Sequence, residues 1–98
     1  MILTFRNQGA EDVFDGKGSK AARKTCPPDL QRRARAKLFL LDDAEDLTDL
    51  KIPPSNHLEA LKGDRSGQHS IRINQQYRIC FRWTESGVHD AEIVDYHS

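Results

Sequence analysis

Residues 77–83 alternate between two kinds of side chain, and this pattern constrains the fold more than any other feature of the sequence. Successive side chains of a β-strand point to opposite faces, so a period of two predicts a strand with one buried face. The apolar positions are Tyr77, Ile79, Phe81 and Trp83, and the opposite ones are Arg78, Cys80 and Arg82. We therefore expect a sheet with one covered apolar face and one open face that carries arginine.

Other segments extend this strand into a meander. Residues 69–74 alternate in the same way, and residues 88–96 are typical of a final strand. Leu58 and Ala60 indicate a short strand before residues 62–67, a connection rich in turn-forming residues. Because the connections are short, neighbouring strands are expected to run antiparallel.

The N-terminal half has helical periodicity. Cys26-Pro27-Pro28-Asp29 is typical of a helix start, and residues 29–44 continue with an apolar stripe three to four residues apart. The stripe consists of Leu30, Ala34, Leu38 and Leu41. Residues 9–15 predict a brief helix, residues 44–50 a further turn, and residues 2–5 a short opening strand. The expected class is α+β, with N-terminal helices packed on one face of a small antiparallel sheet.

Composition excludes several classes of protein. A chain of 98 residues is long enough for one domain, residues 1–98, and its net charge of zero argues against coating DNA or membrane by bulk charge. No apolar run approaches the roughly 18–20 residues of a membrane span, and the N-terminus lacks a signal-peptide pattern, so we expect a cytoplasmic protein. Cys26 and Cys80 lack metal-binding spacing and the four histidines are scattered, so no metal and no cofactor are expected.

The zero net charge hides segments of opposite sign. Residues 17–40 carry a net charge of +7 and residues 65–84 one of +4, so basic surface can form locally. The arginines of the open sheet face, with two cations of the adjacent connection, are interpreted as a phosphate cradle. The set is Lys62, Arg65, Arg72, Arg78 and Arg82. The alternative is that Arg72 and Arg82 pair across strands with Glu92, Asp90 or Glu85.

Three functional side chains, Asp95, Tyr96 and His97, stand together near the end of the sequence. On a regular strand Asp95 and His97 share one face and Tyr96 takes the other. Histidine can donate or accept a proton near neutral pH, and tyrosine can donate a hydrogen bond. The alternative is a frayed polar terminus. Glu59, three residues before Lys62, is either a general base beside a phosphate clamp or part of a surface ion pair.

Taken together, three segments resemble the HigB-type toxins of the RelE/ParE superfamily, which belong to bacterial toxin–antitoxin systems. These segments are residues 56–74 with the turn Leu61-Lys62-Gly63-Asp64, residues 77–83, and residues 92–97 with the ending Asp95-Tyr96-His97. The opening residues and the helical region fit as well, so the resemblance covers nearly the whole chain.

The resemblance implies a small curved antiparallel sheet with helices on one face and an RNA-binding cleft on the other. It implies an endoribonuclease without a metal, which cuts messenger RNA in the ribosomal A site and stops growth. Lys62 and Arg78 would contact the phosphate and its transition state. The catalytic terminus would be formed by Asp95, Tyr96 and His97.

One departure from the family pattern concerns the general base. Glu59 stands where some relatives carry a histidine, so either Glu59 or His97 would draw the proton from the 2′-hydroxyl of the RNA. A second departure is His69, which stands where an aromatic residue is common. Tyr96 and His97 would position the base or protonate the leaving oxygen.

The family also implies partners. They are a small antitoxin of the helix-turn-helix DNA-binding type, the ribosome and messenger RNA, with DNA contacted only through the antitoxin complex. Arg33 and Lys37 lie on a basic helix that would face the antitoxin or RNA. Two alternatives remain open: a non-enzymatic ParE-like toxin that binds DNA gyrase, against which the ending Asp95-Tyr96-His97 speaks, and a plain binding module.

Overall fold

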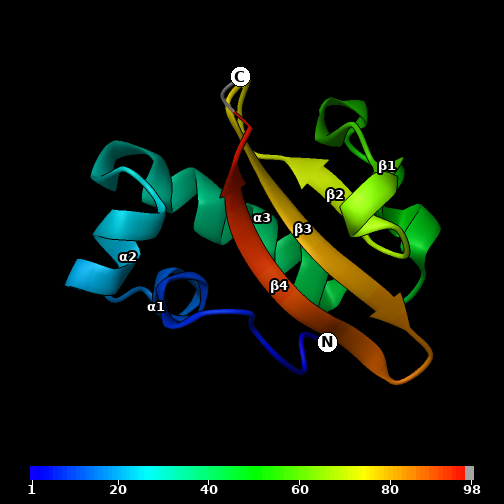
Figure 1. The fold of residues 1–98 in the computed structure, drawn as a ribbon, viewed down its shortest axis with the longest axis horizontal. Helices are drawn as coiled ribbons and strands as arrows, with labels where there is room; N and C mark the ends of the chain where they lie inside the picture. The colour runs from blue at the N-terminus through cyan, green and yellow to red at the C-terminus, as the bar shows by residue number, and fades with distance from the viewer. Residues whose placement is uncertain (97–98) are drawn as a thin grey trace.

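A four-stranded antiparallel sheet forms the centre of the computed structural model, which describes residues 1–96 (Figure 1). The strands follow one another in space as they do in the sequence, so the expected meander is confirmed. They are β1 (Glu59–Ala60), β2 (His69–Arg72), β3 (Tyr77–Thr84) and β4 (Gly87–Asp95). The long strands β3 and β4 curve across the molecule in front of the helix α3 (Figure 1).

The register places one row of residues on the outer face of the sheet. Glu59 pairs with Ser70, Ser70 with Cys80, and Cys80 with Glu92. Directly opposite residues in antiparallel strands share a face, so these four side chains cross the sheet in line. The neighbouring row includes Arg72 opposite Arg78, and the two-sided pattern expected for β3 is therefore confirmed.

A β-bulge interrupts the pairing of β3 with β4. Cys80 pairs with Glu92 but Arg82 pairs with His89, so β4 holds one extra residue between them. Asp90 has φ of 58°, a left-handed conformation that aspartate tolerates better than most residues. Because of the extra residue, Val88 and Ala91 both point into the core and are fully buried, although they are three residues apart.

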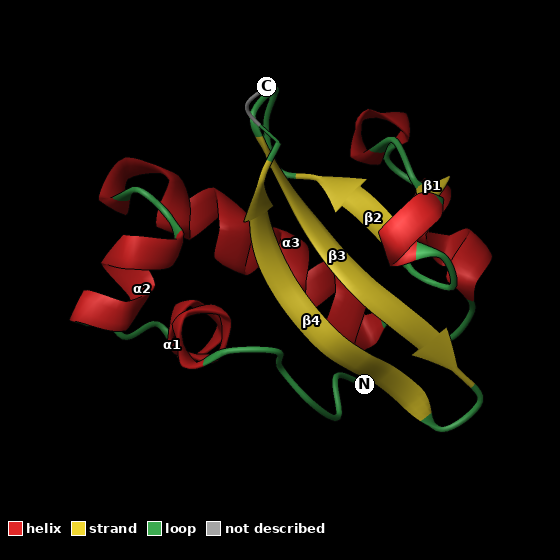
Figure 2. Cartoon of the chain, viewed as in Figure 1, coloured by secondary structure: helices red, strands yellow, loops and turns green. Residues whose placement is uncertain are grey.

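Three α-helices and several short 3-10 turns surround the sheet (Figure 2). The helices are α1 (Gln8–Asp15), α2 (Lys20–Thr25) and α3 (Gln31–Asp43), and the turns are η1 (Pro28–Leu30), η2 (Leu47–Lys51), η3 (Pro54–Asn56) and η4 (Gly63–Arg65). Side chains of Asn7 and Ser19 cap the first two helices by accepting from backbone N–H groups. The expected helices at 9–15 and 29–44 are confirmed, whereas α2 was not predicted.

The helix α2 is held against α1 by a close backbone approach. A β-carbon at Gly9 would lie 1.8 Å from Oγ1 of Thr25, so only glycine allows the two helices this separation. Ala22 is the single buried residue of α2. A six-residue helix with one buried side chain has no amphipathic stripe, which explains why the sequence pattern did not reveal it.

The core lies between α3 and the inner face of the sheet. Ala34, Leu38 and Leu41 of α3 are fully buried and belong to one cluster with apolar residues of the strands. The strands contribute Ile71, Ile79, Phe81, Val88, Ala91 and Ile93. The prediction that helices cover one sheet face and leave the other to carry polar residues is thus confirmed.

The N-terminal residues run beside β4 as an extension of the sheet, but they do not form the short strand that was expected. Two isolated parallel bridges, Ile2 with Val88 and Phe5 with Ala91, hold the segment (Figure 1). Because the chain turns away into α1 after residue 7, the pairing stops at two bridges. Within residues 1–96, none of the helices has the length and apolar character needed to cross a bilayer.

Candidate active site on the outer sheet face

Arg78 lies on the outer face near the start of β3, and its surroundings depart from the expected open arginine. Its side chain is only 9% exposed. Nε donates to Oγ of Ser70 at 2.9 Å, and Nη2 donates to the backbone carbonyl of His57 at 2.5 Å. The third contact is an ion pair between Nη1 and Oε1 of Glu59 at 3.0 Å. The guanidinium is therefore held in one orientation by three contacts, two from residues 57–59 and one from β2.

Glu59 is the exposed half of this ion pair. Its side chain is 55% exposed, so one end of the carboxylate faces solvent while Oε1 contacts Arg78. The position follows from the register, because Glu59 pairs with Ser70, whose hydroxyl also contacts Arg78. The alternative prediction, a surface ion pair of Glu59 with the nearby Lys62, is wrong: the partner is Arg78, and the pair has one buried member.

Tyr96 completes the cluster from the C-terminal side. Its ring lies 5.9 Å from the guanidinium carbon of Arg78, within the range of a cation–π contact, and its backbone N–H donates to the carbonyl of Gln76. The hydroxyl lies 3.6 Å from Sγ of Cys80. Burial, followed by the hydrogen bond to Cys80, raises the pKa of Tyr96 above its ordinary value of 10.0. The phenol therefore remains protonated at neutral pH.

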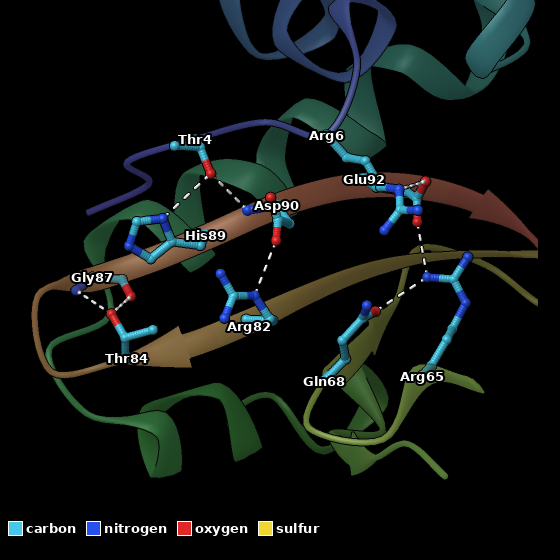
Figure 3. Close-up of polar contacts among 10 residues, drawn as sticks. All are labelled: Thr4, Arg6, Arg65, Gln68, Arg82, Thr84, Gly87, His89, Asp90 and Glu92. Atoms are coloured by element: carbon cyan, nitrogen blue, oxygen red, sulfur yellow. Dashed lines mark hydrogen bonds and ion pairs between the residues drawn. The ribbon is translucent and has the colours of Figure 1, made fainter. Parts of the chain in front are cut away.

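A second group of charges lies beside this cluster around Glu92 (Figure 3). Arg65 donates to Oε1 of Glu92 at 2.8 Å and to the side-chain carbonyl of Gln68 at 3.1 Å, while Nε of Arg6 lies 3.5 Å from Oε2. Figure 3 shows the two arginines approaching Glu92 from opposite sides. The hydrogen bond to Glu92 raises the pKa of Arg65, and the positive charge of Arg65 in turn lowers the pKa of Tyr96.

Arg82 belongs to a separate, more exposed pair. Its Nε donates to Oδ2 of Asp90 at 2.9 Å, and the two side chains are 49% and 41% exposed (Figure 3). The backbone N–H of Asp90 donates to the hydroxyl of Thr4, which ties the bulge to the N-terminal segment. The alternative prediction, that Arg82 pairs across strands with an acid, is confirmed.

The remaining members of the predicted catalytic set are spread around the cluster. Lys62 is exposed at the start of η4, three residues after Glu59. Asp95 pairs in register with Tyr77, and both of its carboxylate oxygens accept from the amide of Gln76 at 3.2 Å. His97 lies outside the described residues.

Three further predicted RNA-binding residues, Arg33, Lys37 and Arg72, gather at the end of β2, beyond its pairing with β1. Arg33 and Lys37 of α3 line a pocket with Arg72. The arginines of the predicted phosphate cradle therefore lie in three places. Arg78 and Arg65 lie beside Tyr96, and Arg82 is paired further along β3. Arg72 turns toward α3.

Three contributors to the cluster were not predicted. Ser70 and Cys80 are fully buried and share the outer face with Arg78. Alternation in β2 and β3 could have revealed both, since they occupy the same face as the arginines. The carbonyl of His57 has no such signal, because its position depends on a left-handed backbone with φ of 45°. Within residues 1–96, no group of three or more His, Cys, Asp or Glu side chains is arranged to hold a metal ion.

The fold is shared with toxins of bacterial toxin–antitoxin complexes. Two structures from Staphylococcus aureus, a YoeB–YefM complex and a heterotetrameric YoeB–YefM toxin–antitoxin complex, contain chains that superpose with TM-scores of 0.60. The superpositions cover 100% of this chain and 99% of each of those chains, at 15% and 14% sequence identity.

The sequence narrows this class to one family. Residues 3–97 match the family described as the RelE-like toxin of the type II toxin–antitoxin system HigB, and the chain belongs to that family. The chain is 34% identical to "Toxin HigB-1" of Vibrio cholerae serotype O1 over 97 residues, which cover 99% of this chain and 98% of the relative. It is 28% identical to "Endoribonuclease HigB" of Proteus vulgaris, over 99% of this chain and 100% of the relative.

Proposed function

We propose that this HigB-family toxin is a metal-independent endoribonuclease that cleaves messenger RNA on the ribosome. The observation that carries the proposal is the cluster of Glu59, Arg78 and Tyr96, which combines a carboxylate, a guanidinium and a protonated phenol on one sheet face. These are the groups that phosphodiester cleavage by an internal nucleophile needs: a base, a cation and an acid. The name of the Proteus vulgaris relative supports the same activity.

The reaction begins with the 2′-hydroxyl of the RNA. The carboxylate of Glu59 takes its proton, the 2′-oxygen forms a bond to the adjacent phosphorus, and the bond from phosphorus to the 5′-oxygen breaks. The products are a 2′,3′-cyclic phosphate and a 5′-hydroxyl. Because one end of the Glu59 carboxylate is exposed, it can meet the hydroxyl while Arg78 holds the other end.

Arg78 stabilises the negative charge that develops on the phosphate oxygens. Its guanidinium is fixed before substrate arrives by Ser70 and the His57 carbonyl, so little reorganisation is required at the moment of reaction. Lys62, three residues after Glu59, supplies a second cation to the phosphate. Tyr96 provides the proton for the leaving oxygen, consistent with its raised pKa. We assign a share of this role to His97 and a supporting role to Asp95.

The partner of this activity is a cognate antitoxin. Membership of a toxin–antitoxin family and the shared fold with YoeB in its complexes support this part of the proposal. We assign the antitoxin to the helix-turn-helix class and expect the toxin to reach DNA only through it. The site of action is the cytoplasm, where ribosomes and messenger RNA meet.

Induction of the chain in a bacterial host, followed by mapping of transcript ends, tests the proposal. We expect growth arrest and new messenger ends that carry a 2′,3′-cyclic phosphate. A variant that lacks residues 96–98 should lose both effects, because it lacks Tyr96 and His97. The matched control is Ser98→Ala, which should retain both.

Unchanged cleavage and toxicity in the truncated variant would contradict the assigned terminus. Growth arrest with DNA breaks and intact transcripts would instead establish the gyrase-binding alternative. Expression of the folded chain without any effect on growth would favour a plain binding module.

A further inference from the structure

A pocket at the end of β2, beyond the two residues that pair with β1, is lined by positive charge from two elements. It has a volume of about 320 Å³ and lies between α3, η3 and the turn that follows β2. We call it the edge pocket, and its polar lining includes Arg33, Lys37, Ser55, His57, Arg72 and Asn74. No carboxylate lines it, and among residues 1–96 no ion pair involves Arg33, Lys37 or Arg72.

One cation of the edge pocket, Lys37, is held in place before any ligand arrives. Nζ of Lys37 donates to Oδ1 of Asn56 at 2.5 Å. Asn56 is fully buried, and its amide nitrogen donates to the carbonyls of Leu50 and Ile52 at 3.1 and 3.3 Å, so its oxygen must face Lys37. The ammonium group of Lys37 keeps two further N–H donors for a ligand.

Electrostatics within the edge pocket favour an anion. Burial and the nearby charge of Arg33 lower the pKa of Lys37, so the two cations of α3 repel each other in this structure. Arg72 stands directly opposite Arg78 in the pairing of β2 with β3, and like charges in that position repel as well. Glu59 neutralises Arg78, whereas no carboxylate within residues 1–96 does the same for Arg72. A bound phosphate would relieve both repulsions.

The edge pocket adjoins the candidate active site. His57 belongs to both, since its carbonyl accepts from Arg78 and the residue also lines the edge pocket. Arg72 and Arg78 are cross-strand neighbours, which places their backbones about 5 Å apart. A ligand with phosphates at successive positions can therefore occupy both sites, whereas an isolated carboxylate from a protein partner gains nothing from this proximity.

We infer that the edge pocket binds a backbone phosphate of RNA, next to the phosphate held at Arg78. The inference rests on the proposed function, because the strand is either the message itself or the ribosomal RNA beside it. Both sources offer the same phosphodiester chemistry. The edge pocket thus adds an anchoring contact that involves no reacting atom.

The test is a salt titration of binding by the full chain. The first probe is a fluorescent single-stranded RNA oligomer with 2′-O-methyl groups, and the second is ribosomes loaded with the same oligomer; neither can be cleaved. The variant Arg33→Gln/Lys37→Gln removes two charges of the edge pocket, and glutamine at 37 can still donate to Asn56. The control Lys20→Gln/Lys24→Gln removes two exposed charges, also four residues apart, from α2.

We expect the edge-pocket variant to bind more weakly and to flatten the slope of log K against log salt by about 0.7 per lost phosphate contact. The control should keep the wild-type slope. A flatter salt slope of the edge-pocket variant with both probes assigns the phosphate to the message. A flatter slope with ribosomes alone assigns it to ribosomal RNA. Equal slopes for the two double variants with both probes would overturn the inference. So would unchanged RNA binding accompanied by weaker antitoxin binding, which assigns the pocket to a carboxylate.

A second pair of variants tests whether loss of charge, rather than loss of folding, changes the salt slope. Arg72→Lys should stay close to wild type in the titration, whereas Arg72→Gln should flatten the slope, and both should melt at similar temperatures. Failure of the proposed function gives a different pattern. The wild-type protein would then fail to cleave a message that carries 2′-hydroxyl groups, while the salt slopes of the variants still differ. That result would contradict the nuclease proposal and support the inference about the edge pocket.

Discussion

Two arginine–carboxylate pairs on the same face of β3 have nearly equal lengths and very different surroundings. Arg78 lies 3.0 Å from Glu59, and Arg82 lies 2.9 Å from Asp90. The side chain of Arg78 is 9% exposed and also contacts Ser70, whereas that of Arg82 is 49% exposed. The comparison teaches that burial and the number of contacts, rather than distance, separate a candidate catalytic pair from a surface pair.

The comparison also explains why each pair exists. A buried guanidinium is costly unless its nitrogens find acceptors, and the three nitrogens of Arg78 contact a hydroxyl, a carbonyl and a carboxylate. Solvent satisfies the donors of Arg82 in addition to Asp90, so that pair can be lost at little cost. Three substitutions in the two pairs test this difference, and two more test the surroundings of the neighbouring Tyr96.

The largest effect is expected for Arg78→Gln. Loss of the fixed cation should reduce RNA cleavage by about 100- to 1,000-fold. The acceptors left unpaired at Ser70 and His57 should lower the free energy of unfolding by about 1–3 kcal/mol. Cleavage assays and urea denaturation measure the two losses. Cleavage within a few-fold of wild type would remove Arg78 from the chemistry.

Glu59→Gln should reduce RNA cleavage while leaving the free energy of unfolding nearly unchanged. Glutamine can still accept from Arg78, but it cannot take a proton, so cleavage should fall by about 100-fold or more. The free energy of unfolding should stay close to that of the wild type, because the side chain is more than half exposed. An active Glu59→Gln variant would transfer the role of general base to His97.

The titration of Tyr96 should respond to its two neighbours in opposite directions. In wild type, ¹³C NMR of the phenol carbon should give a midpoint above pH 10, because burial and the hydrogen bond to Cys80 raise the pKa. Cys80→Ala should lower the midpoint, since the acceptor is lost. Arg65→Gln should raise it further, since Arg65 favours the phenolate. A wild-type midpoint below 10 would contradict the raised pKa of Tyr96.

The smallest effect is expected for Arg82→Gln. An exposed pair contributes about 0.2–1 kcal/mol, so urea denaturation should show a loss within that range. Cleavage should remain within about two-fold of the wild type. A loss comparable to that of Arg78→Gln would mean that exposure does not distinguish the two pairs.

Periodicity predicted which side of β3 each residue faces but not how deeply it is buried. Arg78 was placed correctly on the outer face, yet its burial depends on residues 57 and 59 and on Tyr96, which approach from outside the strand. The alternation of one strand contains no information about such contacts. The pairing of Arg82 with Asp90, by contrast, was open to prediction as a cross-strand pair.

The bulge in β4 could have been predicted from the pattern of apolar residues in the sequence. Val88, Ala91 and Ile93 are all buried, so the apolar period changes phase between residues 88 and 91. An aspartate at the change of phase is compatible with a left-handed residue in a bulge. The edge pocket could not be predicted in this way, because Arg33 and Arg72 are far apart in the sequence and meet only through the packing of α3.

The brevity of β1 bears on how the protein loses activity under stress. Its two residues pair with β2 only through Glu59 and Ala60, and one of them carries the proposed base. An edge of this length can open while the rest of the sheet stays intact, since local openings need far less free energy than global unfolding. Catalysis is therefore expected to disappear at lower urea concentrations than the far-ultraviolet circular dichroism signal, with amide exchange at residues 59–61 marking the segment that opens first.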